Sequence, residues 1–325
     1  APFRFPNPGY PVFQMPLSSR QRRFSDFLLP LAAPLLTLAL FLAFLPPNRY
    51  PLIYGDPDYG YFVSSLLLLR GQSPPWVDHP GTPVQSLGAL VLLVWQTTLG
   101  QEQTVEKSFF LHSFEAHRTM VLTLLAFLLA TQLWCGRALM RLSYPRTLIF
   151  LVPLAPLLFF ETFAYLRRVS PETPLACVSL ALVAVLARAQ EPGFSKTSLW
   201  TPVAVGMLLG LAVSLKAVSL PLLILIFLLP SWSQRKLAFL SLVFFYLNLT
   251  VMIWSRFPFM LKWYESLLFH RGAYGQGSSE LFSFAALSGN LGQIAEDFRF
   301  RGFLACLPAL ALLVFPRGKD RRAWP

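Results

Sequence analysis

The chain has 325 residues, of which 55% are hydrophobic and only 13% are charged, and its mean hydropathy is +0.54. A soluble globular domain carries about 25% charged residues. The composition therefore excludes a soluble protein and indicates an all-α, multi-pass integral membrane protein with lipid as its surroundings. The net charge of +12 would suggest nucleic acid for a soluble protein. In a membrane protein it bears on the orientation of the loops instead, and we expect no nucleic-acid partner.

Apolar runs that resemble membrane helices recur along the whole chain. A spanning helix needs about 20 mostly apolar residues. The first run, 27–45, has no small-residue cleavage site after it, so we expect an anchored helix and not a signal peptide. About eight runs are candidate spans, although several are short: 27–45, 118–141, 147–166, 173–189, 198–215, 217–230, 236–254 and 302–316. Prolines are expected to kink or break some of them, which a bundle tolerates; these are Pro153, Pro156, Pro202, Pro221 and Pro308.

The run 85–99 is too short to span comfortably, and the positions of the basic residues decide its place. If it does not span, the basic clusters fall on one side of the membrane, which the positive-inside rule makes cytoplasmic. If it spans, the cluster at 137–146 moves to the side opposite the basic N-terminus. We therefore expect 85–99 to be a juxtamembrane helix at the outer face. The chain then divides into a cytoplasmic segment (1–26), a transmembrane domain (27–316) with long outer loops (46–117 and 255–301), and a basic cytoplasmic tail (317–325).

Two carboxylates, Asp56 and Asp58, follow the first candidate span. The Gly and Pro residues around them favour a turn. A carboxylate at a membrane face can act as general base for a hydroxyl or amine acceptor. The alternative is an Asx turn or helix N-cap at Asp58, ahead of a helix over 59–70. Asp-x-Asp is also a metal-binding pattern, but three residues are too short a signal to predict a metal.

Further candidates for a substrate site lie in the same outer regions. His79 stands in a rigid Pro-Gly-Thr-Pro frame ahead of a helix N-terminus, which can face an anion, although a lone His is more often a hydrogen-bonded loop residue. Arg167 and Arg168 run against the positive-inside trend; arginine suits phosphate, and snorkelling to lipid headgroups is the alternative. Glu172, four residues after Arg168, either belongs to this site or caps the next helix.

The remaining candidates lie later in the chain. Lys216 stands between two apolar runs near the expected outer face, where an ionisable residue is either functional or an interfacial anchor. His270 and Tyr274 belong to a loop rich in Gly and Tyr. That loop is either a lid or sugar-contacting surface, or part of an interfacial aromatic belt.

Taken together, these residues resemble the GT-C superfamily of polyprenyl-phosphate-sugar-dependent glycosyltransferases, in the family 39-like branch that holds protein O-mannosyltransferases and aminoarabinose transferases. In that branch an acid follows the first span, a Gly ends the next helix, a His-Pro-Pro segment comes next, and a juxtamembrane helix follows it. An Arg with an acid, and later a Gly-x-x-x-x-x-Lys element, come further along. The matching positions here are Asp56-Pro57-Asp58, Gly71, His79-Pro80-Gly81, 85–99, Arg167, Arg168, Glu172 and Gly210 through Lys216. Pro57 replaces the usual second acid, and family members usually have more spans.

The resemblance implies a GT-C-like fold and a reaction on the outer face of a bacterial-type inner or plasma membrane, with the N-terminus cytoplasmic. A sugar would move from a polyprenyl-phosphate donor to an acceptor that the sequence does not name. The catalytic base would be Asp56, with Asp58 as the alternative, and Arg167, Arg168, His79 and Lys216 would bind the donor phosphate. No metal or other cofactor is expected. The alternatives are a non-catalytic GT-C-like subunit of a larger membrane complex, and a lipid flippase or transporter.

Overall fold

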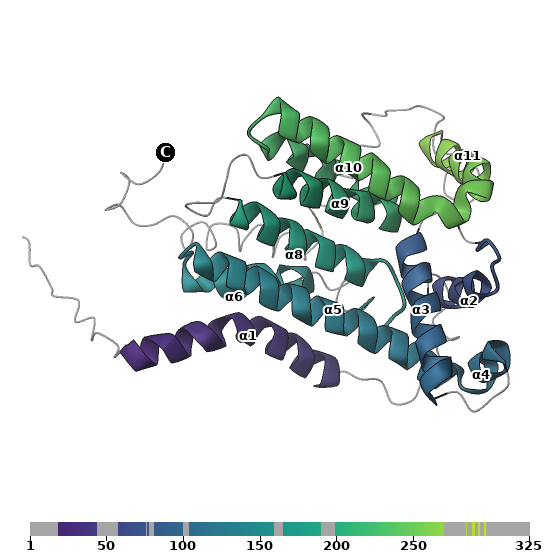
Figure 1. The fold of residues 1–325 in the computed structure, drawn as a ribbon, viewed down its shortest axis with the longest axis horizontal. Coiled ribbons are helices and arrows are strands. Elements are labelled where there is room, and N and C mark those ends of the chain that lie inside the picture. The colour runs from purple at the N-terminus through teal and green to yellow at the C-terminus, as the bar shows by residue number, and fades with distance from the viewer. Residues whose placement is uncertain are drawn as a thin grey trace, which may run out of the picture.

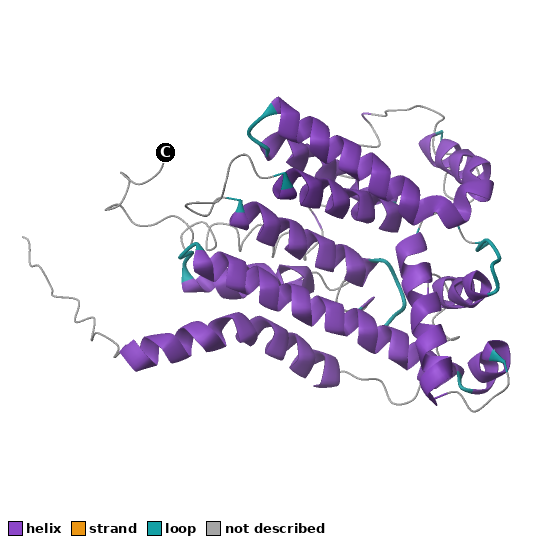
Figure 2. Cartoon of the chain, in the orientation of Figure 1, coloured by secondary structure: helices purple, strands orange, loops and turns teal. Residues whose placement is uncertain are grey.

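The structure is a computed structural model that describes residues 19–43, 58–75, 77, 81–99, 104–158, 165–189 and 199–269, with single residues at 284, 288, 289, 292 and 296. Every regular element in these ranges is a helix, and Figure 2 shows no strand among them. The all-α class expected from the sequence is therefore confirmed for the described part of the chain.

The long helices lie roughly side by side along the molecule, as Figure 1 shows. They are α1 (Ser19–Ala43), α5 (Ser113–Arg141), α6 (Arg146–Leu154), α8 (Glu172–Arg188), α9 (Trp200–Leu215) and α10 (Trp232–Thr250). One helix, α3 (Thr82–Leu99), runs across their ends, beside α2 (Asp58–Leu69) and α4 (Val105–Leu111). The main core lies between these helices. It contains fully buried leucines: Leu92, Leu128, Leu182 and Leu209.

Proline and glycine account for several helix bends and ends. Helix α1 is bent in its middle (Figure 1), where Pro30 and Pro34 interrupt its hydrogen bonding. Helix α2 ends in a Schellman motif at Gly71, whose φ of 69° few other residues adopt. There Gln72 N–H donates to the Leu67 carbonyl at 3.0 Å. The expected helix end at Gly71 is therefore confirmed.

Helices α9 and α10 approach each other closely through two glycines on one face of α9. A Cβ at Gly206 would collide with the Ala238 carbonyl oxygen, and one at Gly210 would lie 2.7 Å from the Leu242 carbonyl oxygen. Small residues at spacing i, i+4 let two helix backbones meet in this way. The two helices therefore form a tightly joined pair.

A buried amide ties α1, α5 and α6 together. Gln132 Nε2 on α5 donates to Thr37 Oγ1 on α1 at 2.9 Å and to the Pro153 carbonyl on α6 at 3.1 Å. Gln132 and Thr37 are fully buried. Because buried polar groups are costly unless paired, these bonds fix how the three helices pack.

The predicted spans agree with the structure best where the apolar run is long. The runs 118–141 and 173–189 correspond to α5 and α8. The run 147–166 is interrupted in its first half, as its prolines indicated. There α6 gives way at Ala155 to a short 3-10 turn, η2 (Ala155–Leu158), because Pro156 has no backbone N–H to continue the α-helix.

One expectation needs correction. The run 217–230 forms the 3-10 helix η3 (Ala217–Leu228) and not an α-helix; Pro221 lies inside it and disfavours α-helical bonding. After α10, the 3-10 helix η4 (Val251–Arg256) leads into α11 (Phe257–Leu268), so the expected outer loop from residue 255 begins with helical residues. The predicted span 302–316 lies outside the described residues.

Among the described residues, two helical stretches are long and apolar enough to cross a membrane: Ser113–Arg141 and Trp232–Ser266. In the first, 44% of the most apolar window is buried inside the protein, whereas in the second only 22% is buried. Large apolar side chains such as Phe239, Leu240 and Phe244 are exposed on α10. An apolar surface of this kind is more typical of contact with lipid or a partner than of the core of a soluble protein.

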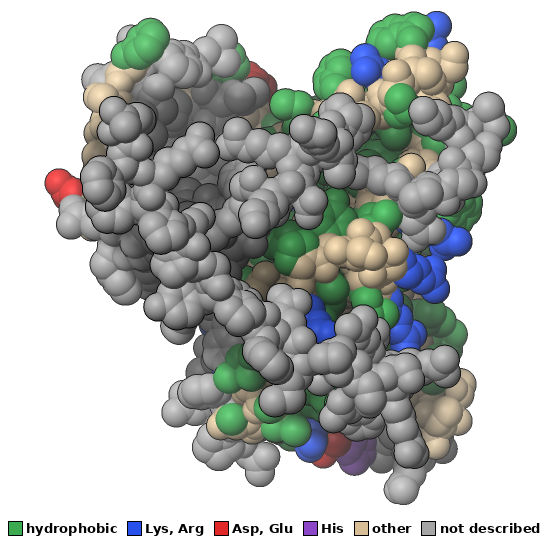
Figure 3. Space-filling model, turned by 90° about the vertical axis from the view of Figure 1, so that its left-hand side faces the viewer, with side chains coloured by type: hydrophobic (Ala, Val, Ile, Leu, Met, Phe, Trp, Pro, Cys, Tyr) green, Lys and Arg blue, Asp and Glu red, His purple; other side chains and the backbone are tan. Residues whose placement is uncertain are grey.

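Basic side chains gather at the end of the bundle opposite α3. This basic end consists of helix termini that carry Arg137, Arg141, Arg146, Arg188, Arg235 and Lys236. Figure 3 looks onto it and shows Lys and Arg side chains among hydrophobic ones. The other end, where α3 crosses the bundle, is called the α3 end below.

Candidate functional site

The carboxylate of Asp58 is fully buried at the start of α2. Its Oδ1 accepts a 2.7 Å hydrogen bond from the backbone N–H of Val169 and lies 2.8 Å from Nε2 of His117 on α5. With its proton on Nε2, His117 donates to the same oxygen. The carboxylate therefore joins α2, α5 and the segment that leads into α8. The sequence allows two roles for Asp58, a base or a local helix cap. Neither role predicts contacts with His117 and Val169.

An aromatic ring packs against the imidazole of His117. The ring of Phe62 meets it edge-on, with centroids 5.6 Å apart. Phe62 in turn stacks on Phe109 of α4 at 4.2 Å. Because apolar rings exclude water, the bond between His117 and Asp58 is shielded from competition by solvent.

A second ion pair lies at the α3 end, between the start of α8 and the end of α9. Lys216 Nζ lies 2.8 Å from Glu172 Oε1, and both side chains are partly exposed. Glu172 Oε2 is buried without a hydrogen-bond partner. Lys216 itself has an extended backbone and ends α9. The pair thus brings together two of the residues singled out from the sequence.

The segment between the two pairs carries Arg167 and Arg168, and both arginines are partly exposed. The guanidinium of Arg168 lies over the ring of Tyr165, 5.2 Å from its centroid, a favourable cation–π geometry. The next residue, Val169, is the one held by Asp58. The polar residues at the α3 end are therefore linked through a short stretch of backbone from Arg167 to Glu172.

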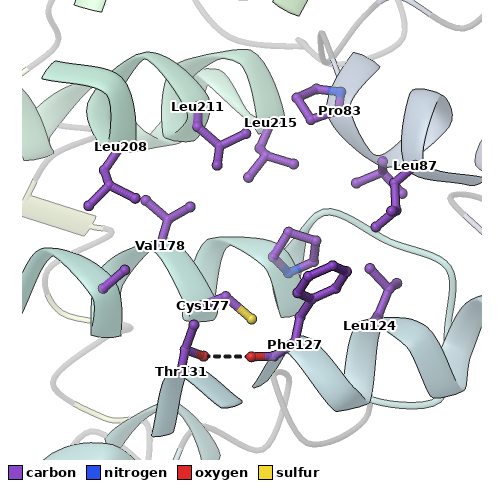
Figure 4. A pocket seen from close by; sticks show the side chains of 13 residues that line it. Pro83, Leu87, Leu124, Phe127, Thr131, Cys177, Val178, Leu208, Leu211 and Leu215 are labelled. Atoms are coloured by element: carbon purple, nitrogen blue, oxygen red, sulfur yellow. Dashed lines mark hydrogen bonds between the residues drawn. The ribbon is translucent and has the colours of Figure 1, made fainter. Parts of the chain in front are cut away.

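An apolar groove of about 290 Å³ lies between the helices (Figure 4). Its walls come from α3, α5, α8 and α9, with Leu87, Phe127, Cys177 and Leu211 among them. Its lining also includes Pro174, two residues after Glu172, and Leu215, which precedes Lys216. The one hydroxyl in the lining, on Thr131, is bonded to the Phe127 carbonyl at 2.9 Å. The groove is therefore apolar along its length, and two of its lining residues are close in sequence to the second ion pair.

Several predicted site residues lie outside the described part of the chain. These are Asp56, His79, His270 and Tyr274. The structure brings Asp58 to Val169, next to Arg168, and brings Glu172 to Lys216. Sequence reasoning missed His117 and the groove. A polar side chain near the end of a long apolar helix was the available signal for His117, because such residues are costly unless they have a role.

Among the described residues, no group of three or more His, Cys, Asp or Glu side chains lies close enough to hold a metal ion. The absence of a cofactor stays a prediction. No family model, curated protein or solved structure matches the chain. A proposal for function therefore draws on the geometry of the α3 end together with the sequence resemblance.

Proposed function

We propose that this protein is a multi-pass membrane glycosyltransferase of the GT-C type that uses a polyprenyl-phosphate sugar as donor. The observation that carries the proposal is the apolar groove whose lining includes Pro174 and Leu215, which are close in sequence to Glu172 and Lys216. A polyprenyl phosphate has an apolar chain with an anionic head. The groove suits the chain, and Lys216 is a cation for the head.

The proposed orientation follows from the distribution of charge and apolar surface. The basic end would face the cytoplasm, in line with the positive-inside rule, and the α3 end, where Arg70 and Lys216 are paired with acids, would face outward. Helix α3, which crosses the bundle (Figure 1), would then lie along the outer surface as a juxtamembrane helix. The exposed apolar side of α10 would contact lipid. We propose about eight spans for the whole chain.

The proposed donor site has two parts. The isoprenoid chain would lie in the groove among leucines of α3, α5 and α9, because burial of apolar surface stabilises by about 25 cal/mol per Å². The phosphate would contact Lys216. Arg167 and Arg168 would add further positive charge from the segment that leads to Glu172. Cations fixed before the reaction stabilise a phosphate leaving group, because the charge that develops meets a field already in place.

The proposed reaction is a single displacement at the anomeric carbon. An acceptor hydroxyl or amine loses its proton to a carboxylate and forms a bond to that carbon. The bond from the anomeric carbon to the phosphate oxygen breaks, and polyprenyl phosphate leaves with the electron pair. The proposed base is Asp56. His79, His270 and Tyr274 remain proposed contacts to donor or acceptor.

The experiment is a binding and transfer assay with the purified protein in lipid nanodiscs. A radiolabelled polyprenyl phosphate measures donor-site affinity without any acceptor, and labelled polyprenyl-phosphate sugars with membrane extracts measure transfer. The test variant is Lys216→Met. The matched control is Lys262→Met, since Lys262 is an exposed lysine on α11.

Three results together support the proposal. The wild type binds polyprenyl phosphate saturably, Lys216→Met reduces transfer by about 10²–10³-fold, and Lys262→Met leaves transfer unchanged. Wild-type protein that neither binds polyprenyl phosphate nor transfers any sugar overturns it and favours the structural-subunit alternative. Binding followed by movement of the labelled lipid between leaflets, without transfer, favours the flippase alternative.

A further inference from the structure

Of the two acids after the first candidate span, Asp58 is the one that the structure describes, and its surroundings are those of a structural anchor. The side chain has no exposed surface, and Oδ1 is occupied by two donors, Val169 N–H and His117 Nε2. Oδ2 is buried without a partner. A general base must come within about 2.6–3.2 Å of the proton that it removes. An enclosed carboxylate offers no such approach to an acceptor.

The two partners of Asp58 come from distant parts of the chain. His117 is on α5 and Val169 lies just before α8, 59 and 111 residues away from Asp58. A buried carboxylate is stable only with good partners, so loss of either bond should release the segment 165–171 from α2. That segment carries Arg168 and leads directly into Glu172.

We propose that Asp58 and His117 are a pair of positioning residues: His117 holds the Asp58 carboxylate, and Asp58 holds the backbone of Val169. The neighbouring Arg168, and Lys216 through its partner Glu172, thereby keep their places. The inference builds on the proposed function, which gives those cations a task. In this arrangement Asp58 needs only an acceptor oxygen, and His117 needs only a donor at Nε2. Neither residue transfers a proton to or from the substrate.

Conservative and disruptive variants separate this role from that of a base. Asp58→Asn keeps an acceptor oxygen, and His117→Gln places an amide donor near the position of Nε2. We expect both to keep transfer within about tenfold of wild type, since the anchoring bonds can still form. Asp58→Leu and His117→Leu remove the bonds. We expect transfer by these two variants to fall about 10²-fold, because a shift of about 1 Å in the cations is enough for such a loss. We also expect KM for the donor to rise. His112→Leu, at an exposed histidine of the same end, is the control.

A second readout does not depend on activity. Amide hydrogen exchange measured by mass spectrometry on peptides that cover 165–171 reports whether Val169 N–H is held. We expect exchange there to be at least about tenfold faster in Asp58→Leu and His117→Leu, and unchanged in His112→Leu.

Two results would overturn the inference. One is an Asp58→Asn variant whose hydrogen exchange matches that of the wild type but whose transfer is as low as that of Asp58→Leu. That pattern identifies Asp58 as the base. The other is unchanged exchange at 165–171 in both leucine variants. If the wild type transfers no sugar at all, the proposed function fails, while the exchange measurement still decides whether the two residues hold the segment.

Discussion

Among the described residues of the α3 end, the pairs Asp58–His117, Glu172–Lys216 and Glu106–Arg70 have the same separation of 2.8 Å and differ in their burial. In the pair of Asp58 and His117 the side chains are 0% and 9% exposed; in the pair of Glu172 and Lys216 they are 19% and 24% exposed. In the pair of Glu106 and Arg70 they are 32% and 53% exposed.

Distance alone therefore does not reveal what each pair does. A buried pair that loses one partner leaves an uncompensated charge, whereas an exposed pair exchanges its partner for water at little cost. The buried pair is suited to hold the backbone, the partly exposed pair to meet a ligand, and the exposed pair to do neither. Substitutions at or beside the three pairs test this order of burial.

The largest effect on stability is expected from the buried pair. Replacing His117 by Leu leaves the Asp58 carboxylate buried with one donor fewer, which should lower the free energy of unfolding by about 3–5 kcal/mol. Lys216→Met removes one charge from the partly exposed pair and should lower it by no more than about 1 kcal/mol. Reversible unfolding in detergent micelles measures both. Equal losses in the two variants would show that burial does not distinguish the pairs.

An intermediate effect is expected in the groove. Leu211→Trp fills part of the groove and should displace about two methyl-sized groups of a bound isoprenoid, at ~0.8 kcal/mol each. We expect affinity for a long-chain polyprenyl phosphate to fall about tenfold, with a much smaller change for a short-chain analogue. Leu122→Trp, at an exposed leucine of α5, is the control. An equal loss for long and short chains would exclude the groove as the chain-binding site.

The smallest effect is expected from the exposed pair, and it depends on pH. Hydrogen bonding from its own backbone lowers the pKa of Glu106, and the Arg70 guanidinium and the Thr104 hydroxyl lower it further. A carboxyl whose pKa is lower in the folded protein than its ordinary value of 4.5 adds stability above that value. That stability is lost as the pH falls through the folded pKa. Glu106→Gln should therefore lower the Tm slightly at about pH 7 and leave it unchanged at about pH 3. A difference in Tm that grows toward low pH would contradict this.

The sequence predicted those elements whose cause is local. The apolar runs of α5 and α8, the glycine end of α2 and the helix at 85–99 follow from composition and spacing within one segment. The 3-10 form of η3 was missed, although Pro221 was recognised as a disruptive residue, because a proline indicates a disturbance and not the geometry that replaces the α-helix.

The candidate site could be predicted only in part, for a different reason. Asp58, Glu172 and Lys216 were recognised as residue types that the chemistry needs. Their partners were not, because Asp58 meets His117 across 59 residues and Glu172 meets Lys216 across 44. Such contacts arise from the packing of helices, and no local pattern encodes them. The groove was missed for the same reason, since its walls come from four helices.

The close approach of α9 and α10 has a consequence for how this sequence can diverge. Gly206 and Gly210 can change only if α10 moves away from α9, since any side chain there meets a backbone carbonyl. The exposed Phe239 and Phe244 on α10 can exchange with other large apolar residues at little cost. In distant descendants of this chain, the two glycines, four residues apart, should therefore stay unchanged while the apolar residues around them are replaced by other apolar residues.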